Sequence, residues 1–314
     1  MIITIDGGTT NTRFYLADPS GIIAARKISI GIRDTVVQGP APLRRAAADC
    51  IRGLIEETAI IPEAVVASGM IGSENGLFVC PHLTAPIDAA GVASALCKTA
   101  MPDIGNFPFY FVPGVKTFGD GTDIPLGKMD IMRGEETELF GLRHIMNITG
   151  KSIFVLPGSH LKVIDVDENG FITGFRTSLS GELLRAAAEH TLLSASLNGV
   201  YPDTAEGDWL AAGCDYARMR GLPEALFKVR ILSKYCADAT PERQFSFLLG
   251  AILQMDADRI AEESGPIYIG GSNPFRDALY NLLRDRADVN RIPPEISETA
   301  SSAGAVLLYD LSKR

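Results

Sequence analysis

The sequence lacks the features that mark several large classes of protein. Its uncharged apolar stretches, such as residues 246–255, are far shorter than the roughly 20 residues of a bilayer-spanning helix. Lysine and arginine total 29 against 38 aspartate and glutamate, a net charge of −9, so the basic surface of nucleic-acid-binding proteins is missing. The 5 cysteines form no CxxC pair and the 4 histidines no HExxH cluster. We therefore expect no membrane segment, nucleic-acid partner, disulfide frame or zinc site.

Length and composition indicate a globular protein of two domains. The chain has 314 residues, and a domain typically has about 150. Hydrophobic residues make up 46% and charged residues 21%, which excludes disorder and coiled coil. The first residues enter a strand without a positively charged leader, and the cysteines are typical of reduced thiols. These features predict a cytoplasmic location.

Two segments of the sequence share one pattern. Residues 2–29 and 153–178 each open with a β-branched run, enter a turn of glycine with serine or threonine, and continue as two strands joined by a second glycine-containing turn. An amphipathic helix follows each segment, over 43–58 and 181–197. The pattern predicts an internal duplication with two α/β domains, 1–150 and 151–314, that meet at a cleft.

Further elements follow in each half of the chain. We expect strands at 64–68, 107–113, 266–270 and 289–292, and helices at 89–101, 134–147, 207–220, 223–236, 241–264, 274–287 and 300–311. The small residues at 300–305 indicate a helix packed closely against another element. Residues 117–128, rich in glycine and aspartate, are the nearest to a loose linker.

The turn after the first strand is a candidate phosphate site. Its two glycines allow a tight turn that exposes backbone N–H groups, and its hydroxyl and amide side chains add neutral donors. An acid at the end of the strand could hold hydrated Mg²⁺, and an arginine adds a planar cationic fork. A polar hairpin is the structural alternative, since the sequence matches neither the Walker A loop nor GxGxxG. The residues are Asp6, Gly7, Gly8, Thr9, Thr10, Asn11, Thr12 and Arg13.

Two later turns carry similar chemistry. One lies at the equivalent point of the second copy, where a structural role is the alternative for its histidine. The other lies between a strand and a helix, where a flat ligand can rest on backbone and where a plain β–α turn is the alternative. The candidates are Gly158, Ser159, His160 and Lys162 in the second turn, and Gly270, Gly271, Ser272 and Asn273 in the third.

Two segments of the first half could bind and activate a substrate. Residues 130–138 combine several acids with Arg133 at the start of an expected helix, where acids also favour the helix dipole. Residues 69–73 follow a strand, and their glycines would let backbone approach a small ligand. The candidate substrate-binding residues are Gly69, Met70, Ile71, Gly72, Ser73 and Arg133.

Together these motifs resemble the actin-like ATPase and sugar-kinase superfamily, and more narrowly the 2-dehydro-3-deoxygalactonokinase family. The resemblance rests on GGTTNTR at 7–13, SGMIGSENG at 68–76, DIMRGEETELFG at 130–141, PGSHLK at 157–162 and FRTSLSGELL at 175–184. It implies two actin-like (ribonuclease H-like) domains, with the final helix packing back toward the cleft. It also implies ATP-dependent phosphorylation of 2-dehydro-3-deoxy-D-galactonate on its 6-hydroxyl.

The resemblance also implies roles for single residues. The first two turns would bind the phosphates of Mg·ATP, with Asp6 orienting the metal, and the third turn would bind adenosine. Glu135 is the first candidate for the base that accepts the hydroxyl proton and Asp130 the second, while Arg133 would bind the substrate carboxylate. Two alternatives remain, a kinase of another sugar or sugar acid and a nucleotide-binding sensor without catalysis. A homodimer is left open.

Overall fold

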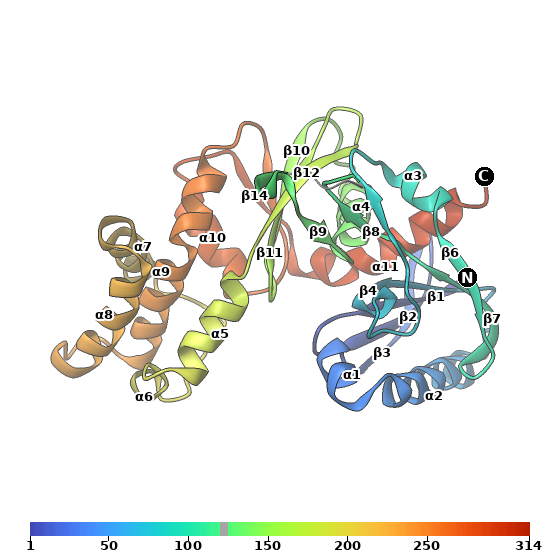
Figure 1. The fold of residues 1–314 in the computed structure, drawn as a ribbon, viewed down its shortest axis with the longest axis horizontal. Coiled ribbons are helices and arrows are strands. Elements are labelled where there is room, and N and C mark those ends of the chain that lie inside the picture. Colours follow the sequence, from blue (N-terminus) through green and yellow to red (C-terminus); the bar gives the residue numbers. More distant parts are fainter. Residues whose placement is uncertain (120–124) are drawn as a thin grey trace. The chain divides into compact units, whose positions relative to one another are not determined.

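The computed structural model describes residues 1–119 and 125–314 (Figure 1). Residues 120–124, within the expected linker 117–128, lie outside the described residues. The chain divides into two compact units. The first contains Met1–Gly150, Val166–Phe175 and Glu295–Arg314, and the second contains Lys151–Asp165 and Arg176–Pro294. The second unit thus differs from the range 151–314 at two segments, one of which carries most of the final helix.

The main sheet of the first unit has six strands in the order β3-β2-β1-β4-β7-β6. β1 pairs antiparallel with β2 and parallel with β4, and β4 pairs parallel with β7. The strands are β1 (Ile2–Gly7), β2 (Thr12–Asp18), β3 (Gly21–Ile28), β4 (Val65–Gly69), β6 (Cys97–Met101) and β7 (Gly105–Phe111).

Side-chain alternation along β1 directs helices to opposite faces of this sheet. Ile3 and Ile5 join a buried cluster with apolar side chains of α2 on one face. Thr4, which lies between them, forms a 2.8 Å hydroxyl–hydroxyl hydrogen bond with Ser302 of α11 on the other. The helices of this unit are α1 (Ile32–Gln38), α2 (Ala41–Thr58), α3 (Ala89–Ser94), α4 (Glu135–Ile145) and α11 (Pro294–Leu311), with 3₁₀ turns at Met70–Gly72 and Leu126–Lys128.

A small three-stranded sheet in the first unit was not expected from the sequence. Its order is β5-β8-β9, formed by β5 (His82–Thr84), β8 (Gly114–Lys116) and β9 (Ile131–Met132). β5 pairs parallel with β8, and β8 pairs antiparallel with β9. These runs are too short to show a periodic pattern, but they align three distant parts of the chain on one surface.

The helix expected over 89–101 is wrong in its second half. Asp88 caps α3 by accepting the N–H of Gly91 at 2.8 Å, and the helix ends after Ser94. Residues Cys97–Met101 instead form β6, which pairs antiparallel with β7 at the sheet edge. Antiparallel pairing with the next strand of the chain here overrides the local helical pattern.

The main sheet of the second unit repeats the topology of the first. Its order is β12-β11-β10-β13-β14, which corresponds to β3-β2-β1-β4-β7, and both β10–β13 and β13–β14 are parallel pairs. The predicted duplication is therefore confirmed. The strands are β10 (Ser152–Leu156), β11 (Leu161–Val166), β12 (Ile172–Ser178), β13 (Ile267–Ile269) and β14 (Val289–Arg291), and the tip of the β11–β12 hairpin is grouped with the first unit.

Helices of the second unit pack around a core centred on α9, with α7 and α8 beside it (Figure 1). A Cβ on Gly213 would lie 1.9 Å from the Phe247 carbonyl oxygen, so α7 and α9 meet backbone to backbone. The helix expected over 181–197 is interrupted at Thr191, whose hydroxyl donates to the Ala187 carbonyl oxygen at 2.6 Å. The helices are α5 (Ser180–His190), α6 (Ser194–Leu197), α7 (Gly207–Arg220), α8 (Leu222–Tyr235), α9 (Pro241–Ala261) and α10 (Phe275–Leu283).

Candidate active site

The first glycine-rich turn connects β1 to β2 and is held from one side by the start of α1. The Gly8 N–H donates to the Asn11 carbonyl oxygen at 2.9 Å. The N–H groups of Ile32 and Arg33 donate to the carbonyl oxygens of Gly8 and Thr9 at 3.1 and 3.0 Å. The turn is thus fixed by backbone bonds while its residues 8–11 stay partly accessible. Such a preset, donor-rich turn suits phosphate oxygens.

Two residues of the first glycine-rich turn, Gly7 and Thr12, have structural roles. Thr12 is buried, and its hydroxyl donates to the Ile30 carbonyl oxygen at 2.8 Å. Gly7 is also buried, and a Cβ there would lie 2.6 Å from the Cβ of Ile71. The remaining candidates of the turn, Gly8 to Asn11, stay available to a ligand.

Asp6 and Arg13 form an ion pair at the mouth of the turn. They face each other across the β1–β2 pair, with Arg13 Nη1 3.0 Å from Asp6 Oδ2. Burial raises the pKa of Asp6, and the Arg13 guanidinium opposes this rise. The Asp6 carboxylate is desolvated, and the side chain of its partner Arg13 is half-exposed. A cation such as a metal ion could therefore also bind to this carboxylate.

Three glycines bring the first turn, the 69–73 loop and the acidic segment into direct contact. A Cβ on Gly69 would lie 2.5 Å from the Gly7 carbonyl oxygen, and one on Gly134 would lie 3.0 Å from the Gly69 Cα. Gly69 and Gly134 also have positive φ values of 81° and 113°. Only glycine tolerates both the conformation and the close approach. Three segments that the sequence suggested separately thus form one site.

The acidic segment begins α4, and its first two glutamates differ in role. Glu136 is fully buried, and its carboxylate accepts the Gly134 N–H at 2.8 Å and the Thr137 hydroxyl at 3.1 Å. It therefore fixes the start of the helix. Glu135 is only half-buried, and one of its two carboxylate oxygens accepts the Arg133 N–H at 3.0 Å.

Asp130 lies ahead of β9, apart from the start of α4. Its carboxylate accepts the N–H of Ile131 at 2.7 Å, and its own N–H donates to the Thr117 hydroxyl at 2.8 Å. These bonds join Asp130 to the small sheet. The geometry supports Glu135 over Asp130 as the candidate base.

Glu138 was missed by the sequence reasoning. It follows Glu135 by one helical turn, and burial together with the charges of Asp6 and Glu135 raises its pKa to about 8. Burial and the Glu135 charge likewise raise the pKa of Glu136 to about 7. The i, i+3 spacing of Glu135 and Glu138 was the available signal, because it places both on one helix face.

The raised pKa values predict how stability depends on pH. In the unfolded chain these glutamates titrate near 4.5, so between about pH 5 and 8 the folded state holds more protons. Stability therefore falls as pH rises through this window. We expect the melting temperature of nucleotide-free protein to drop less from pH 5.5 to 8 in Glu138→Gln than in wild type. Exposed Glu56→Gln should follow wild type, and equal slopes for all three proteins would contradict the prediction.

The 69–73 loop contributes mainly backbone to the site. Ile71 is buried in the hydrophobic core against Gly7, so its side chain is not open to a ligand. The Ser73 hydroxyl donates to the Met70 carbonyl oxygen at 2.6 Å. A Cβ on Gly72 would lie 3.2 Å from Arg133 Nη1, which places this loop beside the guanidinium.

In the second unit, the turn at 157–162 meets the start of α5. The Ser159 carbonyl oxygen accepts the Glu182 N–H at 3.0 Å, and a Cβ on Gly181 would lie 2.0 Å from the Gly158 carbonyl oxygen. Gly158 and Ser159 are exposed, and His160 Nε2 lies 3.7 Å from the Glu182 carboxylate. The N-terminus of an 11-residue helix therefore supports this turn, which favours an anion nearby.

Lys162 does not lie in the exposed turn. It is 4% exposed on β11, and its ammonium donates to the Thr177 hydroxyl of β12 at 2.5 Å. Strand alternation accounts for this position, because β11 begins at Leu161.

The third turn packs against the second. A Cβ on Gly271, whose φ is 70°, would lie 2.5 Å from the Pro157 carbonyl oxygen. Asn273 Nδ2 donates to the Asp277 carboxylate at 2.9 Å, whereas the buried Asn273 Oδ1 accepts no hydrogen bond from the described residues. An unused buried acceptor suits a ligand that supplies a donor, such as the amine of adenine.

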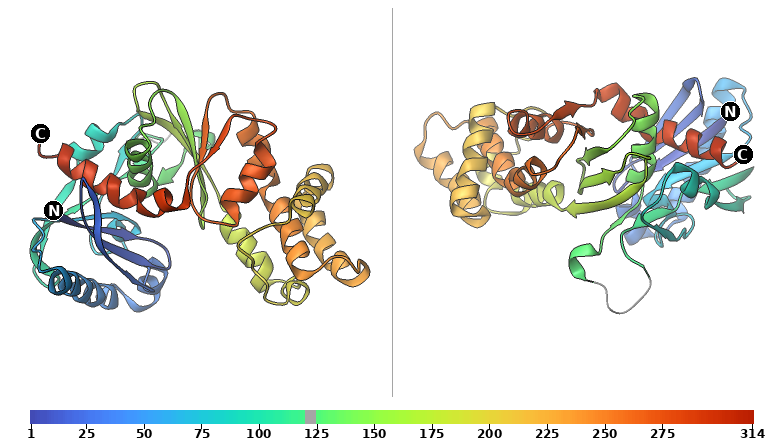
Figure 2. Two further views of the ribbon diagram at one scale, coloured as in Figure 1. Left: turned by 180° about the vertical axis from the view of Figure 1, so that it is seen from behind. Right: turned by 90° about the horizontal axis from the view of Figure 1, so that it is seen from above.

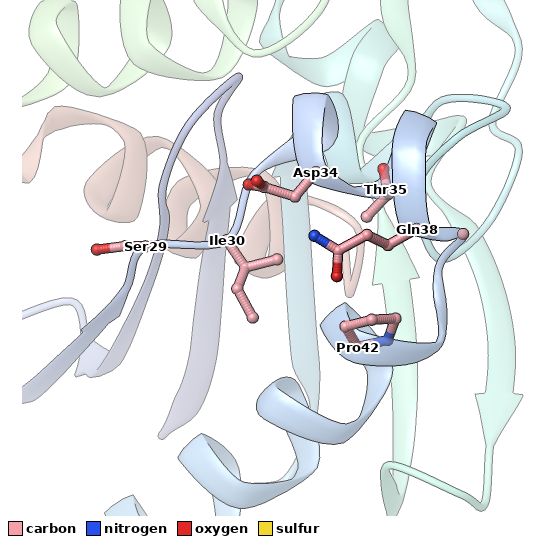
Figure 3. A pocket seen from close by; sticks show the side chains of 7 residues that line it. Ser29, Ile30, Asp34, Thr35, Gln38 and Pro42 are labelled. Atoms are coloured by element: carbon pink, nitrogen blue, oxygen red, sulfur yellow. The ribbon is translucent and has the colours of Figure 1, made fainter.

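A small cavity of about 140 Å³ lies behind the first turn (Figure 3). It is bounded by the end of β3, by α1 and by the start of α2, and Figure 3 shows the Gln38 amide facing Ile30 across it. Asp34 accepts the Gly31 N–H at 2.9 Å, and the Thr35 hydroxyl donates to the Ile32 carbonyl oxygen at 2.9 Å. These hydrogen bonds hold α1 in place, and none of the candidate catalytic or ligand-binding residues lines the cavity.

The described residues contain neither a cluster of metal-binding side chains nor a membrane-spanning helix. Over residues 1–119 and 125–314, no group of three histidine, cysteine or acidic side chains is arranged to hold a metal ion. Across the same ranges, no helix has the length and apolar character needed to cross a bilayer.

The two units define a protein of the actin-like (ribonuclease H-like) fold class. A crystal structure from Sinorhizobium meliloti, described as a candidate 2-dehydro-3-deoxygalactonokinase, matches with a TM-score of 0.78 and 21% identity over 98% of both chains. The activator of 2-hydroxyisocaproyl-CoA dehydratase from Clostridium difficile matches with a TM-score of 0.51 and 15% identity, over 99% of this chain and 95% of that one.

Sequence comparison narrows this class to one family. The model of the family described as 2-keto-3-deoxy-galactonokinase matches residues 6–304, and the chain belongs to this family. It is 29% identical over 282 residues to the 2-dehydro-3-deoxygalactonokinase of Escherichia coli (strain K12), covering 86% of this chain and 85% of the relative. The protein is therefore a kinase.

Proposed function

We propose that this kinase transfers the γ-phosphate of ATP to the 6-hydroxyl of 2-dehydro-3-deoxy-D-galactonate. Family membership over residues 6–304 supports the substrate. The observation that carries the proposal is the contact of the first turn, the 69–73 loop and the α4 acids through Gly7, Gly69 and Gly134. This contact supports a site that combines phosphate donors, a candidate base and an arginine, which phosphoryl transfer to a sugar acid requires.

The reaction asks little covalent chemistry of the protein. The substrate hydroxyl oxygen forms a bond to the γ-phosphorus, the bond from that phosphorus to the ADP oxygen breaks, and Glu135 accepts the hydroxyl proton. Positioning and charge neutralisation supply the remaining rate enhancement. A sensor that only bound nucleotide would need neither Glu135 nor Arg133 beside the turn.

The donor set of the first unit fits Mg²⁺. Mg²⁺ keeps several waters and is bound through one or two carboxylates together with substrate phosphates, so a cage of three protein ligands is not needed. Burial raises the pKa of both Asp6 and Glu138, and the charge of Asp6 raises the pKa of Glu138 further, so the two carboxylates lie near each other. We propose that these two carboxylates hold the ion through its water shell. When bound, it would neutralise phosphate charge.

The nucleotide ligands follow from each unit separately. In the first unit, residues 8–11 offer donors to phosphate oxygens. In the second unit, Gly158, Ser159 and His160 offer backbone and side-chain donors supported by α5, and Asn273 offers its unused acceptor to adenine. Lys162 is buried and donates to Thr177, so we propose that it positions this part of the second unit.

Location and assembly are secondary proposals. The cysteines at positions 50, 80, 97, 214 and 236 all carry free thiols, which supports the cytoplasm, where ATP is also supplied. The net charge of −9 disfavours nucleic acid as a partner, and it requires that a small anionic ligand be held by local backbone N–H groups and a few cations. A homodimer stays a prediction, which light scattering would test.

A substrate panel tests the function. The protein is mixed with Mg·ATP and each of several 2-oxo-3-deoxy sugar acids, and also with the corresponding neutral sugars. We expect ADP release and a product heavier by one phosphate, as measured by mass spectrometry, for the galactonate-derived acid above all others. Turnover restricted to neutral sugars would favour a different kinase, and absence of any phosphorylated product would favour a sensor.

A further inference from the structure

The small β5-β8-β9 sheet places three nitrogen-bearing side chains on one face. His82 of β5 pairs with Gly114 of β8, and Lys116 lies two residues further along the same face. Lys116 pairs in turn with Ile131 of β9, so Arg133 follows on that side as well. We call His82, Lys116 and Arg133 the Arg133 cluster.

Glycine at position 114 makes room for the cluster. A Cβ there would lie 2.6 Å from Cδ2 of His82, so the ring lies directly over the strand. Arg133 Nη2 approaches both ring nitrogens at 3.3 Å and donates to the Cys80 carbonyl oxygen at 2.6 Å.

The guanidinium of Arg133 has no anionic partner among the described residues. Its Nη2 contacts only a carbonyl oxygen and an imidazole, and its buried Nη1 has no hydrogen-bond partner there. Burying a cationic donor without an acceptor is costly, so a ligand that supplies an anion would relieve this cost. Gly72 of the 69–73 loop lies next to this nitrogen, since a Cβ there would lie 3.2 Å from Nη1.

The cluster creates a local positive potential in an acidic protein. Burial and the charges of Arg133 and Lys116 lower the pKa of His82 to about 4, so the imidazole is neutral at physiological pH. Arg133 and Lys116 then supply charge, and His82 supplies a neutral ring nitrogen. A planar fork with an ammonium beside it is suited to a carboxylate.

Within the Arg133 cluster, Arg133 itself lies close in sequence to the acids Glu135 and Glu138 at the start of α4. Arg133 stands at the end of β9, and Glu135 follows two residues later at the start of α4. We propose that the Arg133 cluster binds the carboxylate of the sugar acid, and that His82 and Lys116 together with Arg133 make the enzyme select acids over neutral sugars. The inference rests on the proposed function and adds two specificity-determining residues to it.

The test separates acid binding from nucleotide binding. Lys116→Gln and Arg133→Gln each remove a charge, and the exposed Lys98→Gln and Arg45→Gln are matched controls in the same unit. We expect the KM for the acid to rise about tenfold in Lys116→Gln and about a hundredfold in Arg133→Gln, while the KM for ATP changes less than about twofold. The controls should match wild type.

A binding measurement makes the test independent of turnover. The 6-deoxy analogue of the acid keeps the carboxylate but lacks the 6-hydroxyl to which phosphate would be transferred. The affinity for this analogue, measured by calorimetry, should fall about tenfold in Lys116→Gln and about a hundredfold in Arg133→Gln. Wild type should bind the acid more tightly than the amide of the same acid, and this preference should be smaller in the two variants. If Arg133→Gln does not fold, the Lys116→Gln variant alone tests whether the Arg133 cluster binds the carboxylate.

The outcomes separate the two proposals. Folded variants that keep wild-type KM and analogue affinity contradict the cluster as the carboxylate site, as does an equal rise in the KM of ATP and acid, which indicates a structural role. A wild-type protein that phosphorylates no 2-oxo-3-deoxy acid contradicts the proposed function instead.

Discussion

Glu135→Gln is expected to lower kcat by about 10²–10⁴ while nucleotide affinity is kept. Glutamine preserves the size of the side chain and can still accept the Arg133 N–H through its amide oxygen, so the start of α4 should remain formed. It cannot accept the substrate proton, because its amide is not basic. The loss should therefore appear in kcat rather than in the KM for ATP.

Asp130→Asn is the comparison that gives this result its meaning. Asp130 bonds to the backbone of Ile131 next to the small sheet, so its loss should alter kcat only a few-fold. Steady-state ADP release would be measured for both variants, with ATP binding measured by calorimetry. A fully active Glu135→Gln beside an inactive Asp130→Asn would reverse the assignment. Loss of activity in Glu138→Gln is expected from its proposed part in holding Mg²⁺, so that variant does not identify the base.

The parts of the fold that could be predicted from the sequence are the repeated strand-turn-strand segments and the helices with periodic apolar residues. The two strand-turn-strand segments correspond to β1–β3 and β10–β12, and the apolar spacing of 43–58 corresponds to α2. Both signals are local, since glycine turns and side-chain periodicity need no knowledge of distant residues. The small residues at 300–305 likewise indicated close helix packing, which Gly304 confirms.

The parts that were missed depend on distant pairing. β5, β8 and β9 are two or three residues long and become strands only because they meet. His82 and Lys116 therefore gave no signal as a pair, although the structure places both on one face next to Arg133. Lys162 was expected in a turn because its motif reads continuously from Gly158. The strand begins at Leu161, and alternation turns the lysine toward Thr177.

The helices α4 and α11 lie so close together that a single added methyl group between them should strongly destabilise the protein (Figure 2). A Cβ on Gly304 would lie 1.9 Å from the Thr137 carbonyl oxygen and 3.1 Å from the Gly141 nitrogen. Both are backbone atoms of α4, so no side chain can rotate away and the helices must separate. Glycine is required here for close approach, at the usual cost in helix propensity.

We expect Gly304→Ala to destabilise the protein by at least about 3 kcal/mol, at the upper end for overpacked cores, and to lower the melting temperature by roughly 5–10 °C. The same substitution at Gly207, an exposed first residue of α7 with open space around it, should leave stability unchanged or slightly raised. Because α4 carries Glu135 and Glu138, displacing it should also reduce kcat in the fraction of Gly304→Ala that remains folded. Thermal unfolding of Gly304→Ala and Gly207→Ala tests the expected loss of stability. Measurement of kcat per folded molecule tests the expected loss of activity. A Gly304→Ala protein that melted with wild type would mean that α4 and α11 are not in backbone contact.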